Sequence, residues 1–457
     1  MSNWKVMKLS EVATIVGGGT PSSSKSEYFE NGNIPWITPK DLSGYNKRYI
    51  SKGERNITEL GLKNSSAKLL PKNTVLLTSR APIGYVAIAS NEISTNQGFK
   101  SLVLNNGHIP EFFYYLLKNN VHILESRATG STFKEISGKI LKDTELSIPT
   151  PDIQQKIVDI LSPLDDKIEL NTQINQTLEQ IAQALFKSWF VDFDPARAKV
   201  QALSDGMSLK QAELAAMQAI SGKTPEELTA LSQTQPERYS ELAETAKAFP
   251  CEMVEVDGVE VPKGWEMKAL SDLGQIICGK TPSKSNKEFY GNEVPFIKIP
   301  DMHNQAFITQ TTDNLSLSGA NSQSKKYIPP KSICVSCIAT VGLVSMTSKP
   351  SHTNQQINSI IPNDEQTSEF LYLSLKQPSM TKYLKDLASG GSATLNLNTS
   401  TFSKIEIMTP SKEIIDIFHN KVVYAFEKVL SNSIENKRLA EIRDLLLPNL
   451  LNGESDE

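Results

Sequence analysis

Ile34-Pro35-Trp36-Ile37 returns later in the chain as Val294-Pro295-Phe296-Ile297. The sequence before it is repeated in the same order, with Trp4, Leu9-Ser10, Thr20-Pro21 and Glu27-Tyr28-Phe29 matched by Trp265, Leu270-Ser271, Thr281-Pro282 and Glu288-Phe289-Tyr290. A solenoid repeat would run roughly 20–50 residues, whereas Pro35 and Pro295 stand 260 positions apart. The repeated unit is therefore a whole domain, and a protein that carries one domain twice is expected to contact two similar targets.

The repeat continues through residues 1–150 and 261–410. Further matches pair Thr95-Asn96-Gln97 with Thr353-Asn354-Gln355, Pro71-Lys72 with Pro330-Lys331, and Ile148 to Pro151 with Ile407 to Pro410. Short apolar stretches bounded by Gly, Pro and Asn are typical of strands. We predict an α+β fold with two similar domains, each with a mostly β core and one or two helices.

A heptad-spaced helix is expected after each copy. A seam with steps of three and four carries apolar residues at Ile157, Ile160, Leu164, Ile174, Leu178, Ile181 and Leu185, and again at Ile415, Phe418, Val422, Ala425, Val429, Leu439 and Leu446. Such a seam is typical of paired helices. We predict long helices in residues 151–195 and 411–457 that pair with each other. The alternative is that each helix packs only on its own domain.

Both seams are polar in the middle, where Asn171 and Asn432 are repeat equivalents. A seam Asn lowers stability and specifies alignment. We therefore expect these two residues to fix the register of a helix pair whose apolar contacts include Leu178, Leu185, Val422 and Leu439. Ser162-Pro163 resembles a helix start, so the first helix is either kinked at that point or made of two pieces.

Charge is divided between the copies and their connections. Residues 1–150 hold 18 Lys and Arg against 12 Asp and Glu, and residues 261–410 hold 14 against 11, so both copies are basic. The connecting stretches 151–195, 196–260 and 411–457 carry net charges of −5, −5 and −3, which leaves the whole chain at −4. Two positive domains separated by acidic connections suit a polyanion that is contacted at two places. A solvated surface without a partner is the alternative.

The composition points to a reducing, aqueous compartment. Four cysteines among 457 residues are typical of a cytoplasmic protein, and we find neither a signal peptide nor an apolar run that could cross a membrane. Cys334 and Cys337 have metal-ligand spacing, but the other copy carries Val75 to Thr78 at the matching place. A buried strand is the preferred interpretation, and we expect no metal site.

No catalytic motif withstands comparison of the two copies. Gly274 to Thr281 fits the phosphate-binding pattern G-x-x-x-x-G-K-[ST], yet Pro282 stands where a helix should begin and the matching Ala13 to Thr20 has no lysine. We expect a loop here, with Lys280 available to DNA. The five histidines accompany no evident nucleophile motif, and we find no S-adenosylmethionine glycine loop. The chain is therefore interpreted as a recognition subunit.

These features together resemble the DNA specificity subunits of type I restriction-modification systems. The resemblance covers the whole chain and rests on the repeated opening, Thr95 to Gly98, Ile148 to Ile157, Leu161 to Asn171, Gln183 to Pro195, Gly264-Trp265-Glu266, and Arg443 to Pro448.

The resemblance implies two target-recognition domains, each reading one half of a split double-stranded DNA site. It also implies that the two helices pair antiparallel, with pseudo-two-fold symmetry, as a spacer that sets the gap between the halves. The implied partners are two methyltransferase subunits and, in the full complex, two motor-nuclease subunits. S-adenosylmethionine, ATP and Mg²⁺ would be bound by those partners and no cofactor by this chain. Residues 196–260 depart from the pattern as an acidic helical connector that is either mobile or packed on a methyltransferase subunit.

Candidate DNA contacts are polar residues in expected loops. In the first copy these are Thr20, Ser22, Lys25, Lys40, Arg80, Asn96, Gln97 and Lys134. In the second copy they are Lys280, Thr281, Ser283, Lys284, Lys298, Asn354 and Gln355, with Lys284 and Lys298 taken as counterparts of Lys25 and Lys40. Asn and Gln can read adenine through paired hydrogen bonds. A turn that merely supports each domain explains Thr-Asn-Gln equally well, since it occurs in both copies.

The position of Arg80 is expected to distinguish the two domains. The sequence comparison matches Arg80 with Ala339, so the half-sites should differ there. We predict that Arg80→Ala weakens DNA binding and leaves the preference for the second half-site intact, because a lost cationic contact acts only where it was made. Unchanged affinity in a fluorescence-anisotropy titration would refute a role for Arg80.

Two other classes of function remain open from the sequence. The chain could be a non-catalytic scaffold whose basic domains bind acidic proteins, or the detached recognition arm of a single-chain restriction-methylase. A steep salt dependence of duplex DNA binding separates recognition of DNA from scaffolding.

Overall fold

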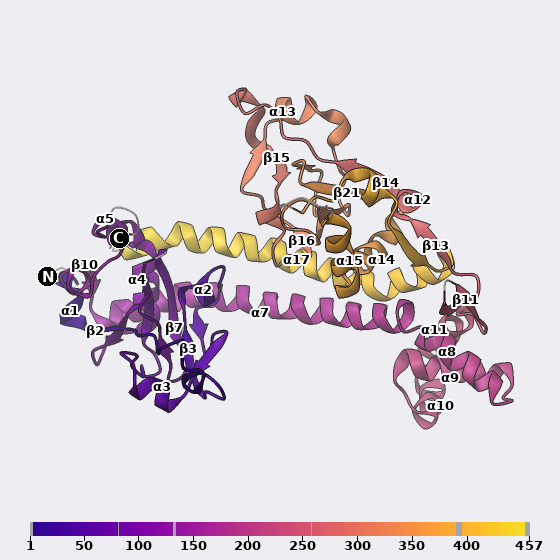
Figure 1. Cartoon of the computed structure of the whole chain (residues 1–457), viewed down its shortest axis with the longest axis horizontal. Helices are drawn as coiled ribbons and strands as arrows, with labels where there is room; N and C mark the ends of the chain where they lie inside the picture. The colour runs from indigo at the N-terminus through magenta and orange to yellow at the C-terminus, as the bar shows by residue number, and fades with distance from the viewer. Residues whose placement is uncertain (1–2, 81, 131–133, 257, 390–394, 453–457) are drawn as a thin grey trace. The chain divides into compact units, whose positions relative to one another are not determined.

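The computed structural model describes residues 3–80, 82–130, 134–256, 258–389 and 395–452. The chain divides into two compact units, Met1–Leu170 with Arg438–Glu457, and Asn171–Lys437. Each unit contains one copy of the repeat and part of both long helices (Figure 1). The boundary therefore runs through the helices and not through a loop.

The first unit is built on a five-stranded sheet in the order β2-β9-β6-β7-β4 and a three-stranded sheet in the order β5-β3-β8. Strands β1 and β10, at either end of the first copy, pair antiparallel. The strands are β1 (Trp4–Lys8), β2 (Ala13–Gly17), β3 (Ile34–Ile37), β4 (Tyr49–Ile50), β5 (Arg55–Ile57), β6 (Val75–Ser79), β7 (Ile83–Ala89), β8 (Ser94–Thr95), β9 (Lys100–Leu104) and β10 (Glu145–Pro149).

The second unit repeats this topology strand for strand. Its five-stranded sheet has the order β14-β21-β18-β19-β16, its three-stranded sheet has the order β17-β15-β20, and β13 pairs with β22. The strands are β13 (Glu266–Ala269), β14 (Gly274–Cys278), β15 (Tyr290–Ile297), β16 (Phe307–Ile308), β17 (Asp313–Leu315), β18 (Ile333–Ser336), β19 (Val344–Thr347), β20 (His352–Thr353), β21 (Ile357–Pro362) and β22 (Glu406–Thr409). The prediction of two similar, mostly β domains is confirmed.

Short helices cover the sheets. In the first unit these are α1 (Leu9–Val12), α2 (Pro39–Leu42), α3 (Glu59–Lys63), α4 (Pro110–Asn119), α5 (Val121–Ser126) and α6 (Gly138–Lys142). In the second copy they are α12 (Leu270–Leu273), α13 (Leu317–Asn321), α14 (Ser368–Lys376), α15 (Pro378–Ala388) and α16 (Thr399–Ser403). The six residues Phe112–Leu117 of α4 are all buried, which makes this helix central to the first core.

Strand pairing fixes how the two copies correspond, and it corrects the sequence comparison. Val75 faces Ile88 and Leu102, whereas Ile333 faces Met346 and Ile360. The offset in this region is therefore 258 residues, so Arg80 corresponds to Ile338 and its match to Ala339 is wrong by one position. The isolated bridges agree, because Arg80 pairs with Glu135 where Ile338 pairs with Asn396. Pro71 likewise corresponds to Pro329, since each carbonyl accepts a bond from the hydroxyl three residues later.

The proposed lysine counterparts are also wrong. Ser22 contacts Ser24 as Ser283 contacts Ser285, so Lys25 corresponds to Asn286 and Lys284 to Ser23. Asp41 accepts a bond from the Thr38 amide as Asp301 does from the Lys298 amide, so Lys298 corresponds to Thr38. The exposed cations of the two domains therefore stand at different places on the same scaffold.

The long helices are α7 (Pro151–Phe190) and α17 (Lys412–Leu451). Helix α7 runs without a break through Pro163 and α17 through Pro448. In the second unit Asn171 bonds Glu435 and Asn436, and Asn175 bonds Ser433, so residue numbers rise along one helix as they fall along the other. The predicted antiparallel pairing of the helices is confirmed.

The helix seam differs from the expected one in part. Ile160 and Ile181 are exposed, at 45% and 59%, whereas Leu161 and Ala182 are buried. At these two places the buried residue of α7 is therefore the one that follows the residue expected from the sequence pattern. The residues named for helix pairing lie as follows: Asn171, Val422 and Asn432 are buried, and Leu178, Leu185 and Leu439 are partly buried.

Residues between α7 and the second copy form a compact group of helices within the second unit (Figure 1). These are α8 (Asp194–Ser204), α9 (Leu209–Ser221), α10 (Pro225–Thr234) and α11 (Pro236–Ala248), followed by the hairpin β11 (Met253–Val256) and β12 (Val259–Pro262). Ala216, Met217, Leu228, Leu242 and Ala246 form their core. The buried Lys199 ammonium donates to the Ala246 and Phe249 carbonyl oxygens, which satisfies carbonyls at the end of α11. No helix in the described part of the chain is both long and apolar enough to cross a membrane.

Candidate nucleic-acid interface

Two turns meet at the surface of the first domain. The amide of Gly19 donates to the Thr95 carbonyl at 2.9 Å, and the Thr20 hydroxyl bonds the Gln97 side-chain oxygen. A Cβ on Gly18 would stand 1.9 Å from the Asn96 carbonyl oxygen. Glycine is therefore required at position 18, because any side chain would push the glycine-rich turn away from Thr95-Asn96-Gln97.

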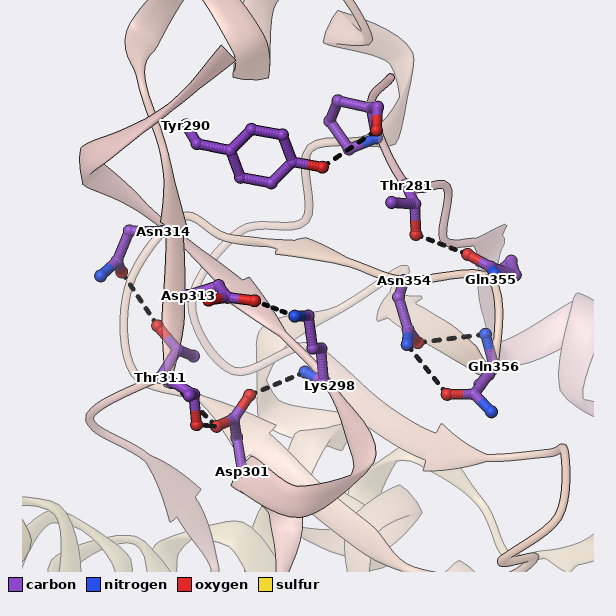
Figure 2. Close-up of polar contacts among 12 residues, drawn as sticks. Thr281, Tyr290, Lys298, Asp301, Thr311, Asp313, Asn314, Asn354, Gln355 and Gln356 are labelled. Atoms are coloured by element: carbon purple, nitrogen blue, oxygen red, sulfur yellow. Dashed lines mark hydrogen bonds and ion pairs between the residues drawn. The ribbon is translucent and has the colours of Figure 1, made fainter. Parts of the chain in front are cut away.

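The second domain builds the same arrangement. The amide of Lys280 donates to the Thr353 carbonyl at 3.0 Å, and the Thr281 hydroxyl donates to the Gln355 side-chain oxygen at 2.6 Å (Figure 2). A Cβ on Gly279 would stand 2.1 Å from the Asn354 carbonyl oxygen. Two exposed glutamines, Gln97 and Gln355, are thus held by threonines at matching points of the two domains.

The asparagines next to these glutamines close their own turns. The Asn96 side-chain oxygen accepts from the Gly98 amide at 2.8 Å, and that of Asn354 accepts from the Gln356 amide at 3.1 Å. The Asn354 side-chain nitrogen also donates to the Gln356 side-chain oxygen (Figure 2). The geometry supports the turn-scaffold interpretation for both asparagines, while the neighbouring glutamines present side-chain amides to the surface.

Several predicted cations are engaged with carboxylates. Lys40 pairs with Glu54 at 2.8 Å, Lys298 pairs with Asp313, and Arg80 stands 3.6 Å from Glu135. The hydrogen bond that the exposed Lys25 ammonium donates to Tyr28 raises the pKa of Lys25. The Ser22 hydroxyl is hydrogen-bonded to Ser24, and the Ser283 hydroxyl is hydrogen-bonded to Ser285. Lys134, Lys280 and Lys284 are exposed.

The two rejected motifs lie in sheets. Gly274–Cys278 forms β14, paired along its length with β21, so its backbone is committed to strand pairing and does not form a phosphate cradle. Cys334 lies in β18 and Cys337 just beyond it, both buried, and burial raises the pKa of Cys334 to about 12 and that of Cys337 to about 11. Among the described residues, no group of three or more His, Cys, Asp or Glu is placed to hold a metal ion.

A buried polar network ties the first domain to the helices. Arg48 donates to the Tyr115 hydroxyl at 3.0 Å and to Asp166 at 2.5 Å, and Tyr115 donates to Asp165 at 2.6 Å. Asp165 also accepts from Arg443 of α17 at 2.6 Å. Burial and the Asp165 carboxylate raise the pKa of Tyr115. These hydrogen bonds connect the first domain to α7 through Asp165 and Asp166, and Arg443 of α17 joins the same network.

The second domain is fixed by a different set of residues. Tyr372 of α14 donates to Glu179 of α7 at 2.6 Å, and Lys376 stands 3.5 Å from the same carboxylate. Aromatic side chains add a large apolar contact, since Phe186 and Phe190 of α7 pack on Phe370 with ring centroids 5.7 and 5.2 Å away. The second domain therefore contacts α7 between Glu179 and Phe190.

His352 adds a pH-sensitive element to the second domain. It precedes the Thr353-Asn354 turn, is fully buried, and packs against Tyr327 with ring centroids 4.3 Å apart. Burial lowers the pKa of His352 from 6.5 to about 4. The His352 imidazole therefore binds a proton more readily in the unfolded chain than in the folded one. The free energy of unfolding must fall as the pH drops from 6.5 towards 4.

We predict that His352→Phe reduces the acid sensitivity of the second unit. At pH 5 the wild-type histidine costs roughly 2 kcal/mol of unfolding free energy relative to pH 7, at about 1.4 kcal/mol for each pH unit below 6.5. Phenylalanine keeps a ring against Tyr327 and cannot titrate. Urea unfolding of both proteins at pH 7 and pH 5 measures the difference, and an equal loss of stability in both would contradict the prediction.

The comparisons with known proteins agree with this architecture. The family model described as type I restriction modification DNA specificity domain matches residues 1–180 and 262–444. The chain is 66% identical to the HindI specificity subunit of a type I restriction enzyme from Haemophilus influenzae, over 99% of this chain and 100% of the relative. It is 33% identical to the MjaIX specificity subunit from Methanocaldococcus jannaschii, over 99% of this chain and 93% of that protein.

A solved structure has the same fold. The S subunit of a type I restriction-modification system from M. genitalium matches with a TM-score of 0.54 and 16% identity, covering 98% of this chain and 96% of the other. The repeated domain, the paired helices and the match over nearly the whole length lead to one conclusion. The chain belongs to the family of type I restriction-modification DNA specificity subunits, the non-catalytic subunits that carry the DNA recognition domains of these enzymes.

Proposed function

We propose that the domains of residues 1–150 and 261–410 each read one half of a bipartite double-stranded DNA site, and that α7 and α17 set the gap between the halves. The observation that carries this proposal is the doubled surface in which a glycine-rich turn meets Thr-Asn-Gln. The same scaffold holds Gln97 and Gln355 at matching points but places its cations differently. One mode of DNA contact follows from the shared scaffold, while the sequence preference of each domain is set by its own base-contacting residues.

The residues that contact DNA are assigned by two criteria. The side chain is exposed, and it is not needed to hold the fold together. Gln97 and Gln355 are exposed beside their turns and offer the amide that pairs with adenine. The exposed Lys134, Lys280 and Lys284, together with Lys25 and Arg80 at the edges, suit phosphate contacts. Lys40 and Lys298 are given a supporting role, because each forms a close ion pair with a carboxylate. Arg80 and Lys25 stand further from their carboxylate neighbours, at 3.6 Å from Glu135 and 3.9 Å from Glu27.

The partners are inferred to be two methyltransferase subunits and, for cleavage, two motor-nuclease subunits in the cytoplasm. S-adenosylmethionine, ATP and Mg²⁺ are assigned to those subunits. Large apolar side chains on the long helices are exposed, at Ile160, Leu170, Ile442 and Leu445 in the first unit and at Ile181, Tyr424 and Ile434 in the second. The long helices are the proposed contact for the methyltransferases, and these residues are the apolar side chains that they offer to such a contact.

Titration with DNA tests the proposal. The chain, co-purified with a methyltransferase subunit, is mixed with duplexes in which one half-site, the other, or both are scrambled. Each half-site should contribute separately to affinity, and binding should fall steeply with salt because phosphates are neutralised. Binding that does not depend on the DNA sequence would instead favour the non-catalytic scaffold. So would the failure of any methyltransferase subunit to co-purify with the chain.

A further inference from the structure

Arg55 is an exposed cation that the sequence patterns do not single out. It lies in β5 opposite Trp36 of β3, and its guanidinium carbon stands 4.2 Å from the Phe29 ring centroid and 5.7 Å from that of Trp36. Within the described part of the chain, no carboxylate pairs with it. The two rings thus support the flat guanidinium group while its N–H donors remain available.

The supporting rings belong to the recognition surface. Trp36 is buried, and its indole nitrogen donates to the Gly19 carbonyl at 3.0 Å. Phe29 packs edge-on against Trp36 with centroids 5.9 Å apart. Gly19 in turn bonds Thr95, and Thr20 bonds Gln97. Arg55 is therefore connected through Trp36 to the turn that presents Gln97, and its position is fixed relative to that glutamine.

The same position in the second domain carries the opposite charge. Asp313 of β17 faces Phe296 of β15, as Arg55 faces Trp36. Asp313 is paired with Lys298 (Figure 2). The Lys298 ammonium lies 5.7 Å from the Phe296 ring centroid. The first domain thus presents a free guanidinium group where the second presents a carboxylate neutralised by lysine.

We propose that Arg55 reads a guanine in the half-site bound by the first domain. Arg55 is linked through Trp36 and Gly19 to the turn that presents Gln97, the residue proposed to read a base. Base contacts change with the sequence that each domain recognises, and the second domain carries Asp313 at this position. A supported guanidinium fork matches the O6 and N7 acceptors of guanine. This inference rests on the proposed function.

Methylation and binding by the complex with its methyltransferase subunit test the inference. The wild type, Arg55→Ala and Arg55→Lys are compared on duplexes that carry all four base pairs at each position of the first half-site. Both variants should lose roughly 5- to 150-fold discrimination for guanine at one position. Lysine keeps the charge but lacks the fork, so it should recover affinity without recovering discrimination. The preference at the second half-site should not change.

The matched control is Arg127→Ala, which removes another exposed arginine of the same domain, one that donates to the Asp143 carbonyl. The Arg127→Ala variant should keep the DNA sequence preference of the wild-type protein. If both Arg55 variants keep the wild-type sequence preference and Arg55→Ala only binds more weakly, with a salt slope reduced by about one, Arg55 contacts phosphate and the inference is wrong. A wild-type complex without sequence preference would instead refute the proposed function, so the two failures are distinguishable.

Discussion

Gly18→Ala is expected to abolish recognition of the half-site read by the first domain. The added Cβ would stand 1.9 Å from the Asn96 carbonyl oxygen and 2.5 Å from the Thr95 hydroxyl oxygen. The first of these is backbone, so the glycine-rich turn has to move away from the turn that presents Gln97. A base contact is worth about 1–3 kcal/mol, so losing the Gln97 contact lowers affinity for the cognate half-site roughly 5- to 150-fold.

The neighbouring residue supplies the control. A Cβ on Gly17 would meet only the Lys100 side chain, at 3.9 Å, so Gly17→Ala should bind DNA as the wild type does. Gly279→Ala should reproduce the loss at the second half-site, because its Cβ would stand 2.1 Å from the Asn354 carbonyl oxygen. Anisotropy titrations on duplexes with one intact half-site measure each effect. Equal affinity of the Gly18 and Gly17 variants would show that the meeting of the two turns is not the recognition surface.

Lengthening the paired helices should move the gap between the half-sites. Seven residues added to α7 after Asn171, and seven to α17 opposite, preserve the heptad phase and extend the pair by roughly 10 Å. At about 3.4 Å per base pair, the preferred gap should grow by roughly three base pairs. The buried contacts of Tyr115 with Asp165 and of Tyr372 with Glu179 lie on either side of the insertion, so each domain keeps its own anchor.

A methylation assay on DNAs whose gaps differ by one base pair measures this change. The lengthened protein and the wild type should methylate different members of the series, and each should still require both half-sites. A preferred gap that stays the same after the insertion would exclude the helices as the element that sets the spacing.

The repeat made most of the architecture predictable. Apolar runs that recur in the same order form the same sheets twice. A phosphate-binding loop at Gly279-Lys280 could be excluded, because the matching Gly18 is followed by glycine and not by lysine. The paired helices were predictable because both helices keep a seam with steps of three and four, apolar at the ends and polar in the middle. In α7 the pattern misplaced Ile160 and Ile181, since tertiary packing selects Leu161 and Ala182 as the buried residues.

The details of the site were less predictable because the loops differ in length between the copies. Matching letters aligned Arg80 with Ala339 and Lys25 with Lys284, but strand register places Ile338 and Asn286 there instead. Arg55 escaped notice for a related reason. Its neighbours Phe29 and Trp36 are distant in sequence, and only the pairing of β3 with β5 brings them together. The opposite charge of Asp313 at the matching position could have indicated that Arg55 matters for recognition. The two residues can be matched only after the strands are paired.

Methylated adenines mapped across the genome of a host that expresses this chain with its methyltransferase partner would reveal whether the recognised site is bipartite. We expect one motif made of two short specific sequences separated by a gap of fixed length. We also expect that Gly18→Ala removes the specificity of one half while the other persists. A single uninterrupted motif, or methylation that depends on no second half-site, would contradict the account.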